Sequence, residues 1–325
     1  MQTFLDTYGW SLVKTFPQDG SSRRYARVSK GEKSAVLMEV LADTPGHRIE
    51  DFIRIGEWLN EIGLKAPQIY EADAAYLLIE DFGDRSFKDV LAEPRNHAAL
   101  YELAHDVLKH LAAQKCSLDL PRYYDSHVHK GHRRVVDWFI PAIRAQANPD
   151  ALVDEYLSVW ERIEQGLPEC PQGFLHVDFH VQNLMWLGKE QGLKQCGILD
   201  FQGAMIGPQP YDLANLLEDV RTDVPADIRC DLLAQYDEDF QAHYRILATQ
   251  FHCRVIGQFI KMAVVDGRDE YLRYLPRAGH YISMALSNPL LGPLKRFFCD
   301  LNLDFDDIKG LNADEIRGYI ASDAF

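Results

Sequence analysis

Several features that define whole classes of protein are missing from this sequence. Its 6 cysteines are scattered and include no C-x-x-C pair, so a disulfide framework is excluded and we expect reduced thiols. No stretch approaches about 18 uncharged apolar residues, and the opening MQTFLDTYGW has no basic segment followed by an apolar one. We therefore expect neither membrane insertion nor export, and we expect a cytoplasmic protein.

Basic residues are also fewer than acidic residues. The chain has 34 lysines and arginines against 49 aspartates and glutamates, which gives a formal net charge of -15. This charge opposes binding to the phosphates of nucleic acids and to anionic lipid surfaces, so neither a nucleic acid nor a membrane is an expected partner. The charge names no ligand, and the sequence gives no indication of protein partners.

The length and composition are those of a globular protein with more than one lobe. Hydrophobic residues make up 47% of the 325 residues and charged residues 26%. Apolar residues with strand spacing occur in RRYARVS, SAVLMEV and AYLLIED, and residues 47–63 show the spacing of one amphipathic helix. The N-terminal part is therefore predicted to be a small antiparallel sheet with one helix.

The pattern changes after IEDFGDRS, where helical spacing becomes dominant. Strand signals return only around FLHVDF, NLMWL and GILDF, before the chain becomes helical again. We predict an α+β fold of two lobes, with residues 1–82 as the N-terminal lobe and residues 83–325 as a larger, mainly helical C-terminal lobe.

The strongest chemical signal is HVDFHVQN at residues 176–183, followed by ILDF at residues 198–201. Phosphoryl transfer from a nucleotide needs a carboxylate that orients and deprotonates the attacking hydroxyl, and oxygen ligands for the magnesium that bridges the phosphates. Asp178 is predicted to be the catalytic base, and Asn183 and Asp200 the Mg²⁺ ligands. Either aspartate alone would be an ordinary loop acid, but the complete pattern favours a function.

These motifs resemble those of the aminoglycoside phosphotransferase and choline kinase group of protein-kinase-like enzymes, which carry HxDxxxxN and a later IDW or LDF. SSRRYARV, VLMEV, EDFGDRS and LDFQGAMIGPQPYDLANLLED look still more like the bacterial anomeric kinases of N-acetylmuramate and N-acetylglucosamine. The likeness is weakest over residues 90–165. It implies an enzyme that uses ATP and Mg²⁺ to phosphorylate a small-molecule hydroxyl acceptor, here the anomeric hydroxyl of an amino sugar in cell-wall recycling.

The nucleotide contacts are harder to place, because the sequence lacks a G-x-G-x-x-G loop. FPQDGSSRR is a polar turn between predicted strands, in which Gly20, Ser21 and Ser22 are candidate phosphate contacts. The resemblance implies that IEDFGDRS is the hinge between the lobes, with adenine against the backbone near Glu80 and Phe82. Val36 is then expected to help wall the base.

A phosphate-binding lysine is also missing. Kinases of this group carry it on the third strand, where this chain has Met38, although the amino-sugar branch tends to lack it as well. Another cation is then needed, and Arg23 and Arg24 are the candidates, with Arg23 on the same strand face as Arg27 and Arg24 on the other. An equally weighted alternative is that these arginines pair with acidic residues of the predicted helix, such as Glu50.

The histidines of these segments allow more than one interpretation. His176 matches the motif histidine and is expected to hold the loop. His180 is common in aminoglycoside phosphotransferases but not in the amino-sugar branch, so it is a candidate substrate contact, with a hydrogen bond inside the loop as the alternative. His127, His129 and His132 have the spacing of metal ligands, but a solvated loop or part of the acceptor pocket is favoured because no cysteine completes the set.

Two other hypotheses remain beside the amino-sugar kinase. One is a kinase of another small alcohol, such as an aminoglycoside or a choline-like molecule. The other is a nucleotide-binding pseudokinase that acts as an interaction module, which Met38 in place of lysine suggests. Asp178, Asn183 and Asp200 argue against the pseudokinase, because a binding module needs no general base.

Overall fold

The computed structural model describes residues 1–17, 23–40, 48–308 and 310–320. Contacts between residues divide the chain into two compact units, of which unit 1 contains residues 1–120 and 173–206, and unit 2 contains residues 121–172 and 207–325. Compactness therefore groups the segment 173–206, which carries HVDFHVQN and ILDF, with the N-terminal part of the chain. The boundary predicted between residues 82 and 83 refers to lobes of the fold, which need not coincide with these compact units. It stays a prediction.

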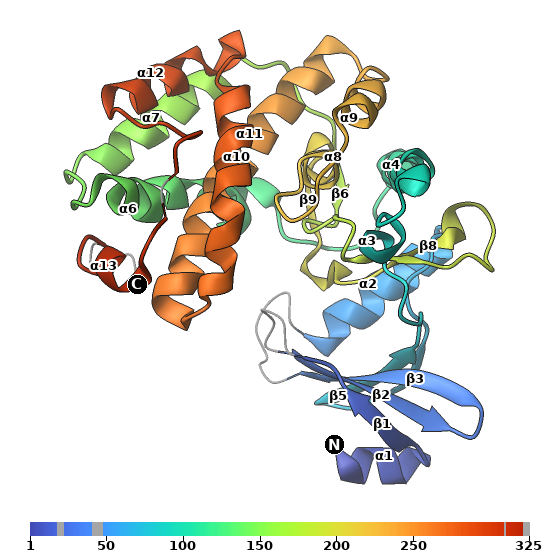
Figure 1. Cartoon of the computed structure of the whole chain (residues 1–325). Helices are drawn as coiled ribbons and strands as arrows, with labels where there is room; N and C mark the ends of the chain where they lie inside the picture. The colour runs from blue at the N-terminus through green and yellow to red at the C-terminus, as the bar shows by residue number, and fades with distance from the viewer. Residues whose placement is uncertain (18–22, 41–47, 309, 321–325) are drawn as a thin grey trace. The chain divides into compact units, whose positions relative to one another are not determined.

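Unit 1 is built on a five-stranded antiparallel sheet with the strand order β1-β2-β3-β5-β4 (Figure 1). Its strands are β1 Ser11–Thr15, β2 Arg23–Lys30, β3 Lys33–Val40, β4 Ile69–Ala72 and β5 Tyr76–Glu80. Gly31 lies in the two-residue turn between β2 and β3 with φ +60°, a left-handed conformation that glycine adopts without a steric penalty. The sheet predicted from RRYARVS, SAVLMEV and AYLLIED is thus observed as β2, β3 and β5.

Two helices flank this sheet. The predicted helix is observed as α2 Ile49–Glu61, and the chain leaves it through Gly63 at φ +89°. A second helix, α1 Gln2–Tyr8, was not predicted; it buries Phe4 and Leu5 against the face of the sheet that carries Val28 and Leu37. Its seven residues are too few for periodicity to distinguish a helix from a strand.

Helix α2 packs against the segment 173–206 within unit 1. Phe52 lies with its ring centroid 4.7 Å from that of Phe201, and Trp58 lies 4.9 Å from Phe174. A Cβ added at Gly56 would lie 3.1 Å from the Phe201 ring, so the missing side chain allows the close approach. The segment after ILDF is therefore fixed against the predicted helix by aromatic packing.

The remaining elements of unit 1 complete the surroundings of the motifs. They are α3 Phe87–Val90, α4 His97–Ala113, β7 Leu184–Trp186 and β8 Cys196–Ile198. Strands β7 and β8 form a two-stranded antiparallel sheet, and β6 Gln172–Leu175 pairs with β9 Met205–Pro208 in another. The strands predicted at FLHVDF, NLMWL and GILDF are thus observed as β6, β7 and β8.

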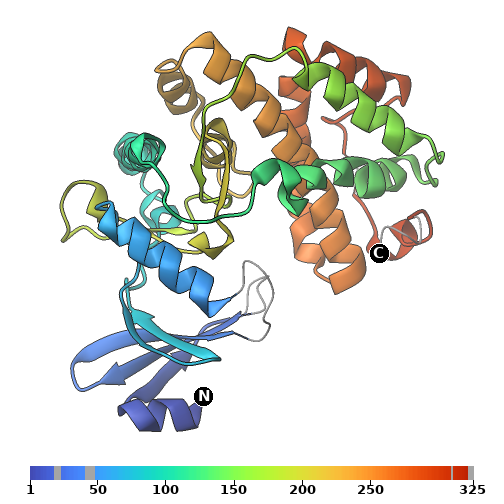
Figure 2. The ribbon, with the colours of Figure 1, turned by 180° about the vertical axis from the view of Figure 1, so that it is seen from behind.

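Unit 2 is helical, as the spacing predicted. Its α-helices are α5 His127–Lys130, α6 Ile140–Arg144, α7 Leu152–Glu164, α8 Pro210–Leu217, α9 Ala226–Leu233, α10 Glu238–Asp266, α11 Leu275–Ala285, α12 Gly292–Asp300 and α13 Ala313–Ile316. Helix α10, drawn in orange, packs against α8 and α11 (Figure 2). In the part of the chain that the structure describes, no helix combines the length and the apolar character needed to cross a membrane.

The core of unit 2 depends on a close contact at one glycine of α10. A Cβ added at Gly257 would lie 2.1 Å from the carbonyl oxygen of Arg134, which no real Cβ atom does. Gly257 therefore lets α10 press against the π-helical turn Val135–Phe139 that follows Arg134. The rings of Trp138 and Phe139 in this turn are buried, so the turn contributes to the core.

Candidate active site

The β7–β8 hairpin brings the motif residues together. Leu184 pairs with Ile198 in the ladder, and the Leu199 N–H donates to the Asn183 carbonyl oxygen at 2.9 Å, which extends the pairing by one step. Leu184 and Ile198 are fully buried, so the register of the hairpin is fixed by the core. Because Asn183 precedes β7 and Asp200 follows β8, the two predicted metal ligands lie at the same end of the hairpin.

The loop between β6 and β7 is closed by hydrogen bonds to its own backbone. The carbonyl oxygen of Asp178 accepts from the His180 N–H at 3.1 Å and from Nδ2 of Asn183 at 3.0 Å. The Asn183 N–H donates in turn to the His180 carbonyl oxygen at 2.9 Å. Since Nδ2 of Asn183 faces the loop, its amide oxygen points away from it, which is the orientation that a metal ligand requires.

The backbone is strained at the residue before Asp178 and at Asp200 itself. Val177, immediately before Asp178, has φ +80°, and Asp200 has φ +59°. Left-handed φ values are unfavourable for residues other than glycine, and for a β-branched residue such as valine they are genuine outliers that cost of the order of 1–3 kcal/mol. Strain of this kind persists where the surrounding structure imposes it, and it concentrates at functional sites.

His176 connects the two halves of the site. Its Nε2 lies 2.8 Å from the carbonyl oxygen of Leu199, and its ring meets the ring edge of Phe179 at 5.5 Å between centroids. Burial lowers the pKa of His176 below its ordinary value, so the ring is neutral at pH 7 and Nε2 donates to the carbonyl. The contact ties the residue two positions before Asp178 to the residue before Asp200.

We expect His176→Ala to lower kcat by roughly 10- to 100-fold, because a small displacement of Asp178 from its acceptor is costly. His110→Ala is the matched control, since Nε2 of His110 also contacts a backbone carbonyl, that of Ile62 at 2.6 Å, elsewhere in unit 1. Steady-state kinetics and thermal melting of both variants provide the measurement. Equal effects on kcat would show that His176 contributes only to stability.

Arg23 approaches this site from the sheet. Its Nη1 lies 3.4 Å from Oδ1 of Asp200, and the Arg23 side chain is 2% exposed while that of Asp200 is 43% exposed. Nε2 of Gln202 donates to the same Oδ1 at 2.5 Å. Tyr25 lies beside the pair, and burial together with the Asp200 charge raises the pKa of its hydroxyl to about 12. Asp200 is thus oriented by neighbours from β2 and from its own loop.

The sequence did not indicate Tyr25 or Gln202 as site residues. Tyr25 follows Arg23 by two residues on β2, so strand alternation would have placed it on the same face as Arg23. Gln202 follows Asp200 by two residues, and only the short 3₁₀ turn Phe201–Gly203 brings its amide back to the carboxylate. No simple sequence pattern marks such a return.

The other two arginines of β2 have different partners. Arg24 is 60% exposed and lies 3.8 Å from Glu39 on the neighbouring strand. Nε of Arg27 lies 2.6 Å from Asp81, and its Nη1 lies 2.8 Å from Asp84. The three arginines thus pair with β3, with the segment after β5 and with Asp200.

The remaining predicted nucleotide contacts lie in β3 and after β5. Val36 is half-buried in β3, opposite Ile79 of β5. The Glu80 carboxylate pairs with Nζ of Lys65 at 2.8 Å, and a Cβ added at Gly197 of β8 would lie 2.8 Å from the Phe82 ring. Gly20, Ser21 and Ser22 lie outside the described residues. Contacts of all these residues, and of Arg24, with a nucleotide stay predictions.

His180 is held inside the loop. It is 7% exposed, its Nδ1 accepts from the Gln182 N–H at 3.3 Å, and its Nε2 lies 3.3 Å from Nδ2 of Asn183. These contacts fit the alternative that His180 stabilises the loop. A contact with substrate stays a prediction.

The histidines of DSHVHKGH pack within unit 2. His132 is buried with its Nδ1 3.3 Å from the Tyr156 hydroxyl, and Nε2 of His129 lies 3.5 Å from a carboxylate oxygen of Glu164. Across the described residues, no group of three potential ligands is arranged to hold a metal ion. Burial lowers the pKa of His132 to about 3, so its ring is neutral at pH 7.

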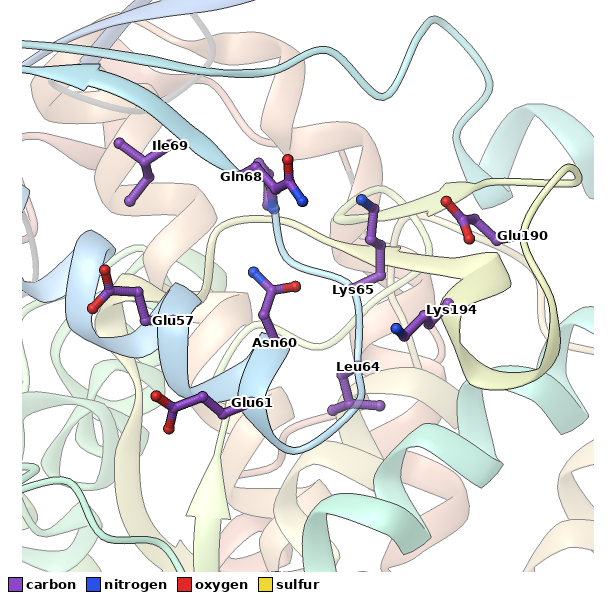
Figure 3. A pocket seen from close by; sticks show the side chains of 10 residues that line it. Glu57, Asn60, Glu61, Leu64, Lys65, Gln68, Ile69, Glu190 and Lys194 are labelled. Carbon is purple, nitrogen blue, oxygen red and sulfur yellow. The ribbon is translucent and has the colours of Figure 1, made fainter.

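A groove of about 840 Å³ opens elsewhere on unit 1 (Figure 3). It lies between the C-terminal part of α2, the segment leading to β4 and the β7–β8 loop, with Asn60, Gln68 and Lys194 among its lining residues. None of the predicted site residues lines it. The groove is therefore distinct from the constellation around Asp178 and Asp200.

Comparison with known proteins identifies the class of this chain. The model of the Phosphotransferase enzyme family matches residues 13–248. The chain belongs to this family, and it is an ATP-dependent phosphotransferase of the small-molecule kinase type. The family resemblance inferred from HxDxxxxN and LDF is thereby confirmed.

Individual relatives show which kinases the chain is similar to in sequence. The chain is 27% identical to an N-acetylmuramate/N-acetylglucosamine kinase of Caulobacter vibrioides over 91% of this chain and 94% of the relative. It is 30% identical to a kinase of the same name from Pseudomonas aeruginosa over 87% of this chain and 86% of the relative. These matches span nearly the whole of each protein.

Solved structures confirm the fold. A thermostable mutant of aminoglycoside phosphotransferase APH(4)-Ia superposes with a TM-score of 0.60 at 15% identity, covering 88% of this chain and 98% of the other. A choline/ethanolamine kinase family protein of Mesorhizobium loti gives 0.58 at 10% identity, with 88% and 92% covered. The predicted α+β kinase-like fold is confirmed by these neighbours.

Proposed function

We propose that this chain transfers the γ-phosphoryl group of ATP to the anomeric hydroxyl of N-acetylmuramate or N-acetylglucosamine. The observation that carries the proposal is the likeness over nearly the full length to kinases named for these two sugars. Solved neighbours at 15% and 14% identity carry ADP or AMP-PNP together with hygromycin B, which supports a nucleotide as donor. A cytoplasmic location fits the proposal.

Asp178 acts as the base in this proposal. The acceptor oxygen forms a bond to the γ-phosphorus, the bond from that phosphorus to the ADP oxygen breaks, and the hydroxyl proton passes to the Asp178 carboxylate. An anomeric hydroxyl is more acidic than an ordinary sugar alcohol, so an aspartate of modest basicity is a sufficient base. The hydrogen bonds to the Asp178 carbonyl fix the backbone and leave the carboxylate for the acceptor.

The residues at the end of the β7–β8 hairpin fit a magnesium ion. An amide oxygen and a carboxylate are ligands that Mg²⁺ accepts, and the Asn183 oxygen and the Asp200 carboxylate are supplied by adjoining ends of one hairpin. When bound, magnesium would neutralise charge that develops on the nucleotide phosphates. Asn183 and Asp200 would hold it, while Gln202 orients Asp200.

The test of this function is phosphorus NMR of the product formed from ATP and each N-acetyl sugar. We expect a sugar phosphate whose phosphorus couples to the anomeric proton. Phosphorylation of a different alcohol alongside no sugar turnover would replace the acceptor and support the aminoglycoside or choline-like alternative. Nucleotide binding without turnover of any alcohol would favour the pseudokinase.

A further inference from the structure

Met38, which stands where related kinases carry the lysine, has a positively charged neighbour in the sheet. Met38 of β3 pairs with Tyr25 of β2, and Val40 pairs with Arg23, so Arg23 is the diagonal neighbour of Met38. Cross-strand partners share a face of the sheet, and diagonal neighbours lie about 7–8 Å apart, within reach of a long side chain. The Arg23 side chain therefore lies on the same face of the sheet as the side chain at position 38, and the two positions are diagonal neighbours.

Arg23 differs from the other arginines of β2 in what it contacts. Arg24 lies on the opposite face and pairs with Glu39, and Arg27 is engaged by Asp81 and Asp84. Arg23 alone among the three contacts a predicted magnesium ligand, Asp200. The guanidinium is buried, so its charge acts in a region of low dielectric, where electrostatic interactions are strong.

The contact between Arg23 and Asp200 is loose. A charge-assisted N–H···O bond is usually about 2.7–2.9 Å long, whereas Nη1 of Arg23 lies 3.4 Å from Oδ1 of Asp200. Tyr25 follows Arg23 by two residues on the same strand face, and its side chain lies beside the guanidinium. Arg23 is thus held close to Asp200 without being locked to it.

We propose that Arg23 replaces the missing lysine as the cation that binds the nucleotide phosphates. In the nucleotide-free enzyme it balances the charge of Asp200. With a nucleotide bound, with or without magnesium, the guanidinium would donate to phosphate oxygens, and magnesium when bound would supply positive charge beside Asp200. This inference rests on the proposed function, and it assigns a role that Arg24 does not share.

The test is the affinity of the purified protein for ADP, measured by calorimetry with magnesium and again with a chelator, with no acceptor present. We expect Arg23→Met to weaken ADP binding by roughly 10- to 100-fold in both conditions, since a hydrogen bond to a charged group contributes about 1.5–3 kcal/mol. Arg24→Met, which removes the same charge from the opposite face, should change the affinity by less than about threefold.

A loss of affinity only in the presence of magnesium would overturn the proposal, because Arg23 would then act solely by orienting Asp200. An unchanged affinity, or an equal loss in Arg24→Met, would overturn it as well. If Arg23→Met does not fold, the pair Arg23→Lys and Arg23→Gln decides, since the proposal requires the lysine variant to bind ADP more tightly than the glutamine variant.

The double variant Arg23→Met/Met38→Lys provides a rescue that a purely structural role of Arg23 would not show. We expect it to bind ADP at least about tenfold more tightly than Arg23→Met, because the cation returns to the same face. If the double variant folds but does not regain affinity for ADP, a lysine at position 38 does not take over the role of Arg23, and the proposal is contradicted. A wrong acceptor leaves these results unaffected, whereas a wild-type protein that binds no ADP would overturn the proposed function itself.

Discussion

Asp178→Asn should lower kcat by roughly 10²- to 10⁴-fold, the contribution expected of a general base. The asparagine amide has the shape of the carboxylate but cannot accept the proton of the acceptor hydroxyl. The loop itself is held through the Asp178 carbonyl oxygen, by His180 N–H and Asn183 Nδ2, and the substitution leaves this atom in place. ADP affinity and melting temperature should therefore stay at wild-type values while the rate collapses.

The measurement is steady-state turnover with the acceptor that phosphorus NMR identifies, together with calorimetric binding of ADP. Asp300→Asn, the same chemical change at an exposed position of α12, serves as the control and should retain full activity. Wild-type kcat in Asp178→Asn would assign the base to another residue. A parallel fall of ADP affinity would mean that the substitution disturbs the nucleotide site instead of removing the base.

Arg245→Met should destabilise the protein by about 3–5 kcal/mol, because it leaves Glu218 buried without its cation. Glu218 is fully buried, and Nη2 of Arg245 lies 2.7 Å from its Oε1. The Tyr244 hydroxyl donates to the same oxygen at 3.1 Å, and the Glu218 carbonyl oxygen contacts Nε2 of His252 at 3.0 Å. The melting temperature is expected to fall by roughly 10 °C in thermal unfolding.

The matched control is the double variant Glu218→Gln/Arg245→Met, which removes both charges. It should recover more than half of the stability lost in Arg245→Met, since the main cost is the unpaired buried charge and not the lost packing. A double variant as unstable as Arg245→Met would assign the effect to the methylene contacts of the arginine. Kinetics are not expected to distinguish the two variants once both are folded.

The pH dependence of folding stability follows from the Glu218 carboxylate. Burial acts to raise the pKa of Glu218, but Arg245 and His252 outweigh it and lower the pKa below its ordinary value. A lowered folded-state pKa means that the stabilisation is present above the unfolded pKa of about 4.3 and is lost as the pH falls through the folded value. The stability difference between wild type and Arg245→Met should therefore shrink in acid, as measured by denaturant unfolding at a series of pH values.

The sequence predicted those elements whose signal is local. Alternation predicted β2, β3 and β5, and helical spacing predicted α2 to within about two residues at each end. Helix α1 was missed because a helix of seven residues has less than two turns in which to show periodicity. It forms because its apolar residues are buried by the sheet, which is a tertiary effect.

The arginines show where sequence reasoning about the site stopped. Alternation correctly separated Arg23 from Arg24 by strand face, but it gave no reason to prefer either face for a phosphate. The sequence suggested acidic residues of α2 such as Glu50 as partners, whereas the structure shows pairs with Asp200, Glu39, Asp81 and Asp84. Such partners depend on which elements pack together, and one-dimensional spacing contains no information about that packing.

The sequence by itself determined the chemistry expected of this protein, because phosphoryl transfer demands particular side chains and the segment 176–201 carries candidates for them in one short stretch. A single hairpin places Asn183 and Asp200, so their juxtaposition depends on local pairing that the spacing of apolar residues already encodes. Only the tertiary structure decided which cation stands beside Asp200. Arg23 is 177 positions away in the chain, and its contact exists because the register of β2 with β3 and the packing of α2 on Phe201 bring two distant segments together.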